Sequence, residues 1–253
     1  MTKQRRRSRI PRRIAPFAIA GFAVATAVRV RRGHEATNDG NGPTDVGFMR
    51  AIHAGLRRDM DRLTAVAPEI DIRGDTSDEV RAGWEAFRDA LRGHHAADDD
   101  DLWPVLCTHL TAADDRGEVD AMVEEHRAIP GAIDAVDAAL SSGVGVVAAV
   151  ADLAAVLHRH LDHEERTVFP LLERHLSRRE WRQFLLTERG RRSIRERPRF
   201  LAWVLDDASE RDEAAVMAEL PPPARVVYRR VIRPRYEAQH RWRSDDVLVK
   251  TPS

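Results

Sequence analysis

Apolar residues recur at intervals of three and four in four long segments of this chain, and this spacing most constrains how it folds. The segments cover residues 46–63, 80–105, 119–140 and 146–171. Residues at this spacing fall on one face of an α-helix, so each segment predicts a helix that packs one apolar stripe against its neighbours. Four such helices with short connections predict an all-α, up-down antiparallel four-helix bundle.

Helix-ending and helix-starting residues lie between and within these stripes. Pro68 is expected to end the first helix near its position, and Thr76 and Ser77 are N-cap candidates for the second. The sequence Ser141-Ser142-Gly143 is expected to stop the third helix. Pro130-Gly131 stands inside the third stripe and predicts a kink there.

Each of the four stripes also carries a histidine, and the second and fourth carry a carboxylate one helical turn later. The six residues are His53, His94, Asp98, His126, His160 and Glu164. Burying a polar group without a partner costs roughly 2 to 7 kcal/mol, and a bare carboxylate costs more. Metal ligation is one compensation that satisfies all six groups, because residues i and i+4 share a helix face and can reach one centre.

The second and fourth segments repeat the same order of residues. HHAADDDDLWPVL begins at His94 and HLDHEERTVFPLL begins at His160. In each, a carboxylate stands four residues after the histidine, and an aromatic-proline pair follows with its proline six residues further on. A single stripe histidine is more often a hydrogen-bonded core residue, and a single H-x-x-x-E pair is common on helix surfaces. The combination favours a metal site.

On these motifs the chain resembles the hemerythrin-like family, also called HHE cation-binding domains, over about residues 46–176. The resemblance implies an up-down four-helix bundle with a non-haem centre of two iron ions. It also implies that Asp98 and Glu164 bridge the ions and that the four stripe histidines are terminal ligands. A ferritin-like di-iron site fits less well, because it uses Glu-x-x-His pairs and more carboxylates than the imidazole-rich set found here.

One departure from the oxygen-carrying members concerns a missing nitrogen donor. Those members have a second histidine one turn after the third-helix ligand, where Pro130 stands here. Two octahedral irons would then keep about two coordination positions unfilled, which favours chemistry or sensing over reversible carriage. His95 is a candidate for the missing donor, because some relatives ligate at that position, and a solvated side chain is the alternative. Four other histidines are interpreted as surface or outer-layer groups: His109, His158, His163 and His175.

The function predicted from this pattern is a di-iron protein that binds or senses dioxygen, another small diatomic ligand, an oxidant or iron. The alternative is an oxidase or peroxidase that works at the same irons, and a third class is a bundle that holds no metal. No second set of buried polar residues is evident that would line a substrate pocket, which favours a binding protein over an enzyme. Aliphatic residues flank the expected ligands and favour a small ligand: Leu56, Leu91, Ile129 and Leu157.

Residues 1–45 form a basic and apolar N-terminal extension that ends in a linker rich in Gly, Asn and Asp. The apolar stretch from Ile14 to Val28 is shorter than the roughly 20 residues that cross a bilayer, but it matches the core of a signal peptide. A basic extension without fixed structure is the preferred interpretation, and it predicts a cytoplasmic protein. Export or membrane tethering through residues 1–33 is the alternative.

Charge and cysteine content narrow the remaining classes. The 41 basic and 41 acidic residues cancel, which gives no overall field to attract nucleic acid. Cys107 is the only cysteine, so neither an internal disulfide nor a cluster of thiolate ligands is available within one chain. Residues 177–253 predict short helical pieces without evident chemistry, in which the Arg-dense stretch 225–243 is a weaker candidate for contact with an acidic partner or a membrane.

Overall fold

The computed structural model describes residues 44–239 and 241–242, and among these the regular structure is helical, apart from a single bridge residue at Ser177. The expected N-terminal extension, including Ile14 to Val28, lies outside the described residues apart from its last two positions. Four long helices account for the four stripes: α1 (Gly47–Arg73), α2 (Asp78–Ala97), α4 (Ala113–Ser142) and α5 (Val146–His175). Within the described residues, no helix is both long enough and apolar enough to span a bilayer.

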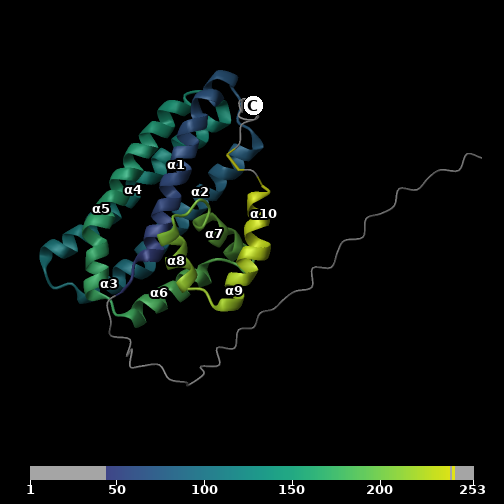
Figure 1. The fold of residues 1–253 in the computed structure, drawn as a ribbon. Coiled ribbons are helices and arrows are strands. Elements are labelled where there is room, and N and C mark those ends of the chain that lie inside the picture. The colour runs from purple at the N-terminus through teal and green to yellow at the C-terminus, as the bar shows by residue number, and fades with distance from the viewer. Residues whose placement is uncertain (1–43, 240, 243–253) are drawn as a thin grey trace, which may run out of the picture. The chain divides into compact units, whose positions relative to one another are not determined.

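The four long helices lie lengthwise beside one another (Figure 1). Helix α5 contacts both α1 and α4, and α1 also contacts α2. The stripe residues face inward, because side chains from all four helices are fully buried in one apolar core: Leu56, Leu91, Ile129 and Leu157. The chain is therefore all-α, and its apolar periodicity identifies the buried face of each long helix correctly.

Two of the expected helix boundaries are confirmed and one is wrong. The Ser77 hydroxyl accepts a hydrogen bond from the Val80 N–H and caps α2, and Gly143 ends α4 in the left-handed conformation. The first helix does not end at Pro68 but continues to Arg73. Burial of Ile70 on the same stripe stabilises the last turns, and this outweighs the one hydrogen bond that proline removes.

The second stripe is not one continuous α-helix. Helix α2 ends at Ala97, a π-helical turn η1 (Asp98–Leu102) follows, and α3 (Trp103–His109) completes the stripe. Pro104 stands at the start of α3 and has no N–H for the carbonyl four residues earlier. The proline thus favours a wider turn before it, and that turn begins at the predicted ligand Asp98.

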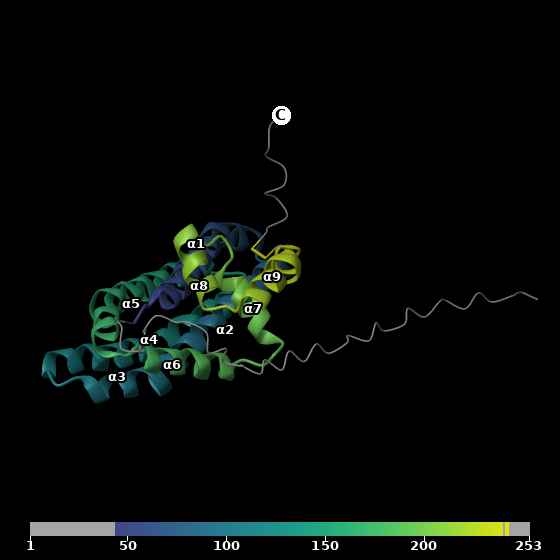
Figure 2. The ribbon, with the colours of Figure 1, turned by 60° about the horizontal axis from the view of Figure 1, so that its bottom comes forward.

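The C-terminal extension covers the outer sides of α1 and α2 (Figure 2). Its elements are α6 (Arg178–Arg191), α7 (Glu196–Val204), α8 (Glu210–Ala218), α9 (Pro222–Val227), η2 (Tyr228–Ile232) and α10 (Arg233–Glu237). The Trp203 indole N–H donates to the buried Asp59 carboxylate of α1 at 2.7 Å. The same ring packs on Gly55, where a Cβ would lie 3.1 Å from it, and Trp242 packs in the same way on Gly83 of α2.

Gly143 and Gly145 give a matched pair for testing the loop between α4 and α5. Both have positive φ, but a Cβ at residue 143 would overlap the backbone of Gly74, whereas residue 145 has no neighbour within 4 Å. Gly145→Ala should cost about 1 kcal/mol for the left-handed backbone alone. Gly143→Ala should cost at least about 2 kcal/mol, because the two helix ends must also separate. Chemical denaturation of both variants measures the difference, and equal losses would contradict the close contact.

Candidate metal centre

The structure buries all six residues that the sequence indicates as ligands, and it brings them together from the four long helices and η1. Their exposures are 5% or less. One group consists of His53 of α1, His94 of α2 and Glu164 of α5. The Nε2 atom of His53 lies 3.0 Å from Nε2 of His94 and 3.2 Å from a carboxylate oxygen of Glu164. Two donors about 2.1 Å from one ion and at right angles to each other are about 3 Å apart, so this spacing suits a shared ion.

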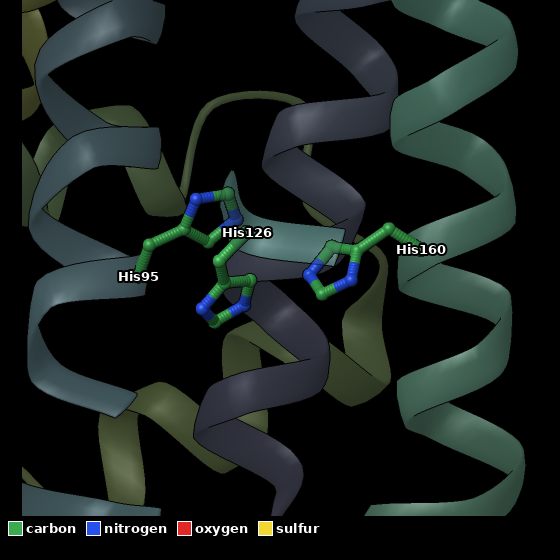
Figure 3. Close-up of side chains that lie close together, drawn as sticks. All are labelled: His95, His126 and His160. Carbon is green, nitrogen blue, oxygen red and sulfur yellow. The ribbon is translucent and has the colours of Figure 1, made fainter. Parts of the chain in front are cut away.

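A second group consists of His95, His126 and His160, from α2, α4 and α5 (Figure 3). The rings of His95 and His126 stack with centroids 4.0 Å apart, and the His160 ring stands nearly perpendicular to both. His95 therefore points into the core and is not the solvated neighbour of His94. This placement contradicts a solvated side chain, although His95 is more exposed than the other two histidines, and its role as a metal ligand stays a prediction.

Three carboxylates outside the two groups fix how three of these imidazoles point. The Nδ1 atoms of His53, His126 and His160 lie within 2.9 Å of one carboxylate each, from Glu165, Asp99 and Glu125 respectively. A carboxylate accepts hydrogen bonds and does not donate them, so the proton sits on Nδ1. Each Nε2 then presents its lone pair to the interior, which is the arrangement of metal-binding histidines.

These outer carboxylates belong to wider networks at the edge of the core. Arg57 donates to Glu165 at 2.6 Å and to Asp162 at 2.7 Å. His163 contacts Glu125 and Glu118 through its two ring nitrogens, which places it one layer outside His160. The sequence reasoning missed the three carboxylates, because each stands next to a stripe position on a face that is polar in any amphipathic helix.

Several buried polar atoms in this region have no hydrogen-bond partner. Both carboxylate oxygens of Asp98 and of Glu164 are in this state, and so are the Nε2 atoms of His95, His126 and His160. Buried acceptors and lone pairs that face one another repel unless a proton or a cation lies between them. The donor set has nitrogen and oxygen atoms only, and Glu164 lies within 4 Å of histidines from both groups, so the residues fit bound metal ions.

Most of the pKa shifts agree with this arrangement, and that of His53 differs: burial would lower its pKa, but Glu164 and Glu165 raise it above its ordinary value. Burial raises the pKa of Asp98 well above its ordinary value, and the nearby Glu164 raises it further. Burial would also raise the pKa of Glu164, but His53 beside it lowers that pKa below its ordinary value. Burial lowers the pKa of His94, His95 and His160, which favours the neutral imidazole that binds metal.

The π-helical turn explains how so many polar groups of one segment face the interior. His94, Asp98, Leu102 and Leu106 follow one another at intervals of four and are all buried. In an α-helix with 3.6 residues per turn, each such step drifts by about 40° around the axis. The wider turn over residues 98–102 absorbs this drift, and π-helical turns of this kind are often found at functional sites.

The fold and these side chains define a helical domain with a buried histidine and carboxylate site for cations. Comparison with protein families identifies the hemerythrin HHE cation binding domain over residues 44–172. This match covers half of the chain, and the chain belongs to that family. Comparisons with curated proteins and with solved structures give no match.

The raised pKa of Asp98 predicts how the metal-free protein responds to Asp98→Asn. As the pH rises above the ordinary value of 3.8, the unfolded chain releases the Asp98 proton while the folded chain retains it. The folded state loses stability in this range, and the neutral amide avoids that loss. At pH 7, metal-free Asp98→Asn should therefore have a free energy of unfolding about 1 kcal/mol or more above that of metal-free wild type, and it should melt at a higher temperature. This difference should shrink toward pH 4.

The matched control is Asp152→Asn, at an exposed position of α5, which should melt like the wild type at both pH values. Thermal melts followed by circular dichroism after treatment with a chelator give all three values. A metal-free Asp98→Asn protein that melts below the wild type at pH 7 would contradict the buried, uncompensated carboxyl.

Proposed function

We propose that this chain is a non-haem di-iron binding protein that binds or senses a small diatomic ligand, an oxidant or iron. The observation that carries the proposal is the pair of three-residue donor groups, one of which includes Glu164, together with the buried, unpartnered carboxylate oxygens of Asp98 and Glu164. His53 and His94 would hold one ion, and His95, His126 and His160 the other, with the two carboxylates shared between them. The proposal includes the up-down antiparallel arrangement of α1, α2, α4 and α5 as a four-helix bundle.

Iron is the ion that suits the donor set best. Two histidines and one carboxylate form a set that non-haem Fe(II) takes, and His53, His94 and Glu164 provide it. Sites that hold zinc for structure commonly include cysteine, and Cys107 does not belong to either group. The many imidazoles, three of them fixed through Nδ1 by outer carboxylates, also match the needs of a redox-active divalent metal.

The placement of His95 changes the expected number of open coordination positions. With five histidines instead of four, two octahedral ions would keep about one position free rather than two. Bound iron would supply an open coordination site for a small ligand. The protein's own residues hold the imidazole tautomers and keep bulk water away, because Leu56, Leu91, Ile129 and Leu157 are fully buried around the site. Such packing admits a diatomic molecule more readily than an organic substrate.

The first prediction of this proposal is the metal content of the purified protein and its variants. Wild type expressed with added iron should hold close to two iron atoms per chain. Asp98→Ala and Glu164→Ala should each lose nearly all of it, because a shared ligand holds both ions. His95→Ala should lose at most about one iron, since that residue stands in one group only. Elemental analysis measures all four proteins.

His109→Ala is the control for this series, because His109 pairs with Glu180 near the end of α3 and belongs to neither group. It should keep the wild-type iron content. Less than about half an equivalent of transition metal in the wild type would remove the proposal. Equal iron content in Asp98→Ala, Glu164→Ala and His95→Ala would show that the shared ligands are assigned wrongly.

A second prediction separates ligand binding from catalysis. Reduced, iron-loaded protein mixed with oxygen or nitric oxide should show a rapid change in its iron absorption bands, because the open position accepts a small molecule. Oxidation of added organic donors should remain far below the roughly 10 per second of a typical enzyme. Stopped-flow absorption and donor oxidation assays measure the two rates. Sustained turnover near that typical rate would favour the oxidase or peroxidase alternative.

A further inference from the structure

The run of four aspartates at the π-helical turn is divided between two sides of the chain. Asp98 is fully buried, and Asp99, although exposed, accepts a hydrogen bond from Nδ1 of His126. Asp100 and Asp101 instead accept hydrogen bonds from Arg191, at 3.1 Å to Asp100 and 2.7 Å to Asp101. Arg191 is the last residue of α6, which lies beyond the part of the chain that matches the family.

The residue after Arg191 forms a buried ion pair with Glu188. Arg192 donates to Glu188, and only 13% and 5% of their side-chain surfaces are exposed. The Arg192 guanidinium lies over the Phe200 ring, 3.5 Å from its centroid. It also packs against Gly93 of α2, where a Cβ would lie 2.7 Å from Nη2. Because residue 93 has no side chain, a cation of the extension reaches the helix backbone one residue before His94 and His95.

The pair Glu188 and Arg192 is largely buried against the helix that carries His94 and His95. The second carboxylate oxygen of Glu188 is buried without a hydrogen-bond partner. The pair is therefore held close to the donor groups and is not part of a solvated surface.

We propose that the C-terminal extension positions the metal ligands. Arg191 holds the π-helical turn that carries Asp98 and Asp99, and the pair Glu188 and Arg192 holds the turn of α2 that carries His94 and His95. These are positioning residues that do not touch the metal themselves, and the inference rests on the proposed metal binding. Loss of their contacts frees the ligand turns to move, so bound iron leaves faster although the long helices remain folded.

The test measures how fast iron leaves the full-length, iron-loaded protein when a strong ferrous chelator is added without oxygen. Arg191→Gln should release iron about two- to fivefold faster, because a partly exposed pair contributes little. Arg192→Gln should release iron at least about tenfold faster, because it leaves Glu188 buried without its cation. Arg192→Lys keeps the charge but not the planar fork, so its release rate should lie between wild type and Arg192→Gln.

Two controls separate ligand positioning from a general loss of stability. Arg189→Gln changes an exposed arginine on the same helix and should release iron at the wild-type rate. Trp203→Phe removes the hydrogen bond to Asp59 on α1 and should lower the melting temperature without changing iron release. A coupled contact also predicts that Arg191→Gln has no further effect in a protein that already carries Asp100→Asn and Asp101→Asn.

The outcomes distinguish the inference from the proposal on which it rests. Failure of the wild type to hold iron would remove both. A wild type that holds iron, with Arg191→Gln and Arg192→Gln releasing it no faster than Arg189→Gln, would overturn the inference alone. Release rates that follow the metal-free melting temperature across all variants, Trp203→Phe included, would also overturn it. If Arg192→Gln gives no folded protein, Arg192→Lys and Arg191→Gln decide between these outcomes by the same comparison.

Discussion

The structure depends on electrostatic repulsion in its core, where two carboxylates and several imidazoles face one another with few hydrogen-bond partners. Asp98 and Glu164 are fully buried, and none of their oxygens has a hydrogen bond. Protonation of Asp98 relieves part of the repulsion, which is why burial and Glu164 raise its pKa. A bound cation would relieve all of it and would convert the same groups from a cost into a source of stability. Burial of the apolar stripes supplies the folding free energy that offsets the cost of these buried polar groups. Such unfavourable groups in a core indicate where a functional site is expected.

The outer carboxylates decide which atoms of the imidazoles are left for chemistry. Asp99, Glu125 and Glu165 each hold an Nδ1 atom from the rim of the core, and the Nε2 lone pairs consequently point inward. Free imidazoles exchange tautomers and orientations easily, so a site without these contacts would have to order its ligands when metal binds. Here the ordering is completed during folding. Asp98 and Asp99 contribute to both layers from adjacent positions, which the wider backbone turn at residues 98–102 accommodates.

Much of this arrangement could be predicted from the sequence, because helical periodicity and ligand chemistry act on the same positions. A histidine or carboxylate on an apolar stripe is an anomaly that the sequence shows directly, and the four histidines and two carboxylates at such positions are buried together. His95 could not be decided in this way, because a neighbour of a stripe residue lies about 100° away and can face either side. The outer carboxylates were missed because an acidic residue beside the stripe looks the same whether it meets solvent or an imidazole. Pro68 was misread as a helix end, because a local rule was applied where buried Ile70 decides.

The glycines within α1 and α2 indicate where the C-terminal extension packs, and the interpretation of the sequence did not use them. A glycine inside a helix costs roughly 0.5 to 1 kcal/mol relative to alanine, so several in two helices call for a compensating close contact. Gly55, Gly83 and Gly93 each have a large side chain of the extension against them, whereas Gly117 and Gly131 of α4 have no neighbouring atom within 4 Å of the point where a Cβ would lie. The extension therefore packs where the helices give up side chains to receive it. When no cation is bound, the buried donor atoms repel one another and destabilise the packing of the core. The contacts between the extension and the glycines of α1 and α2 can then hold the ligand turns in place before metal binds.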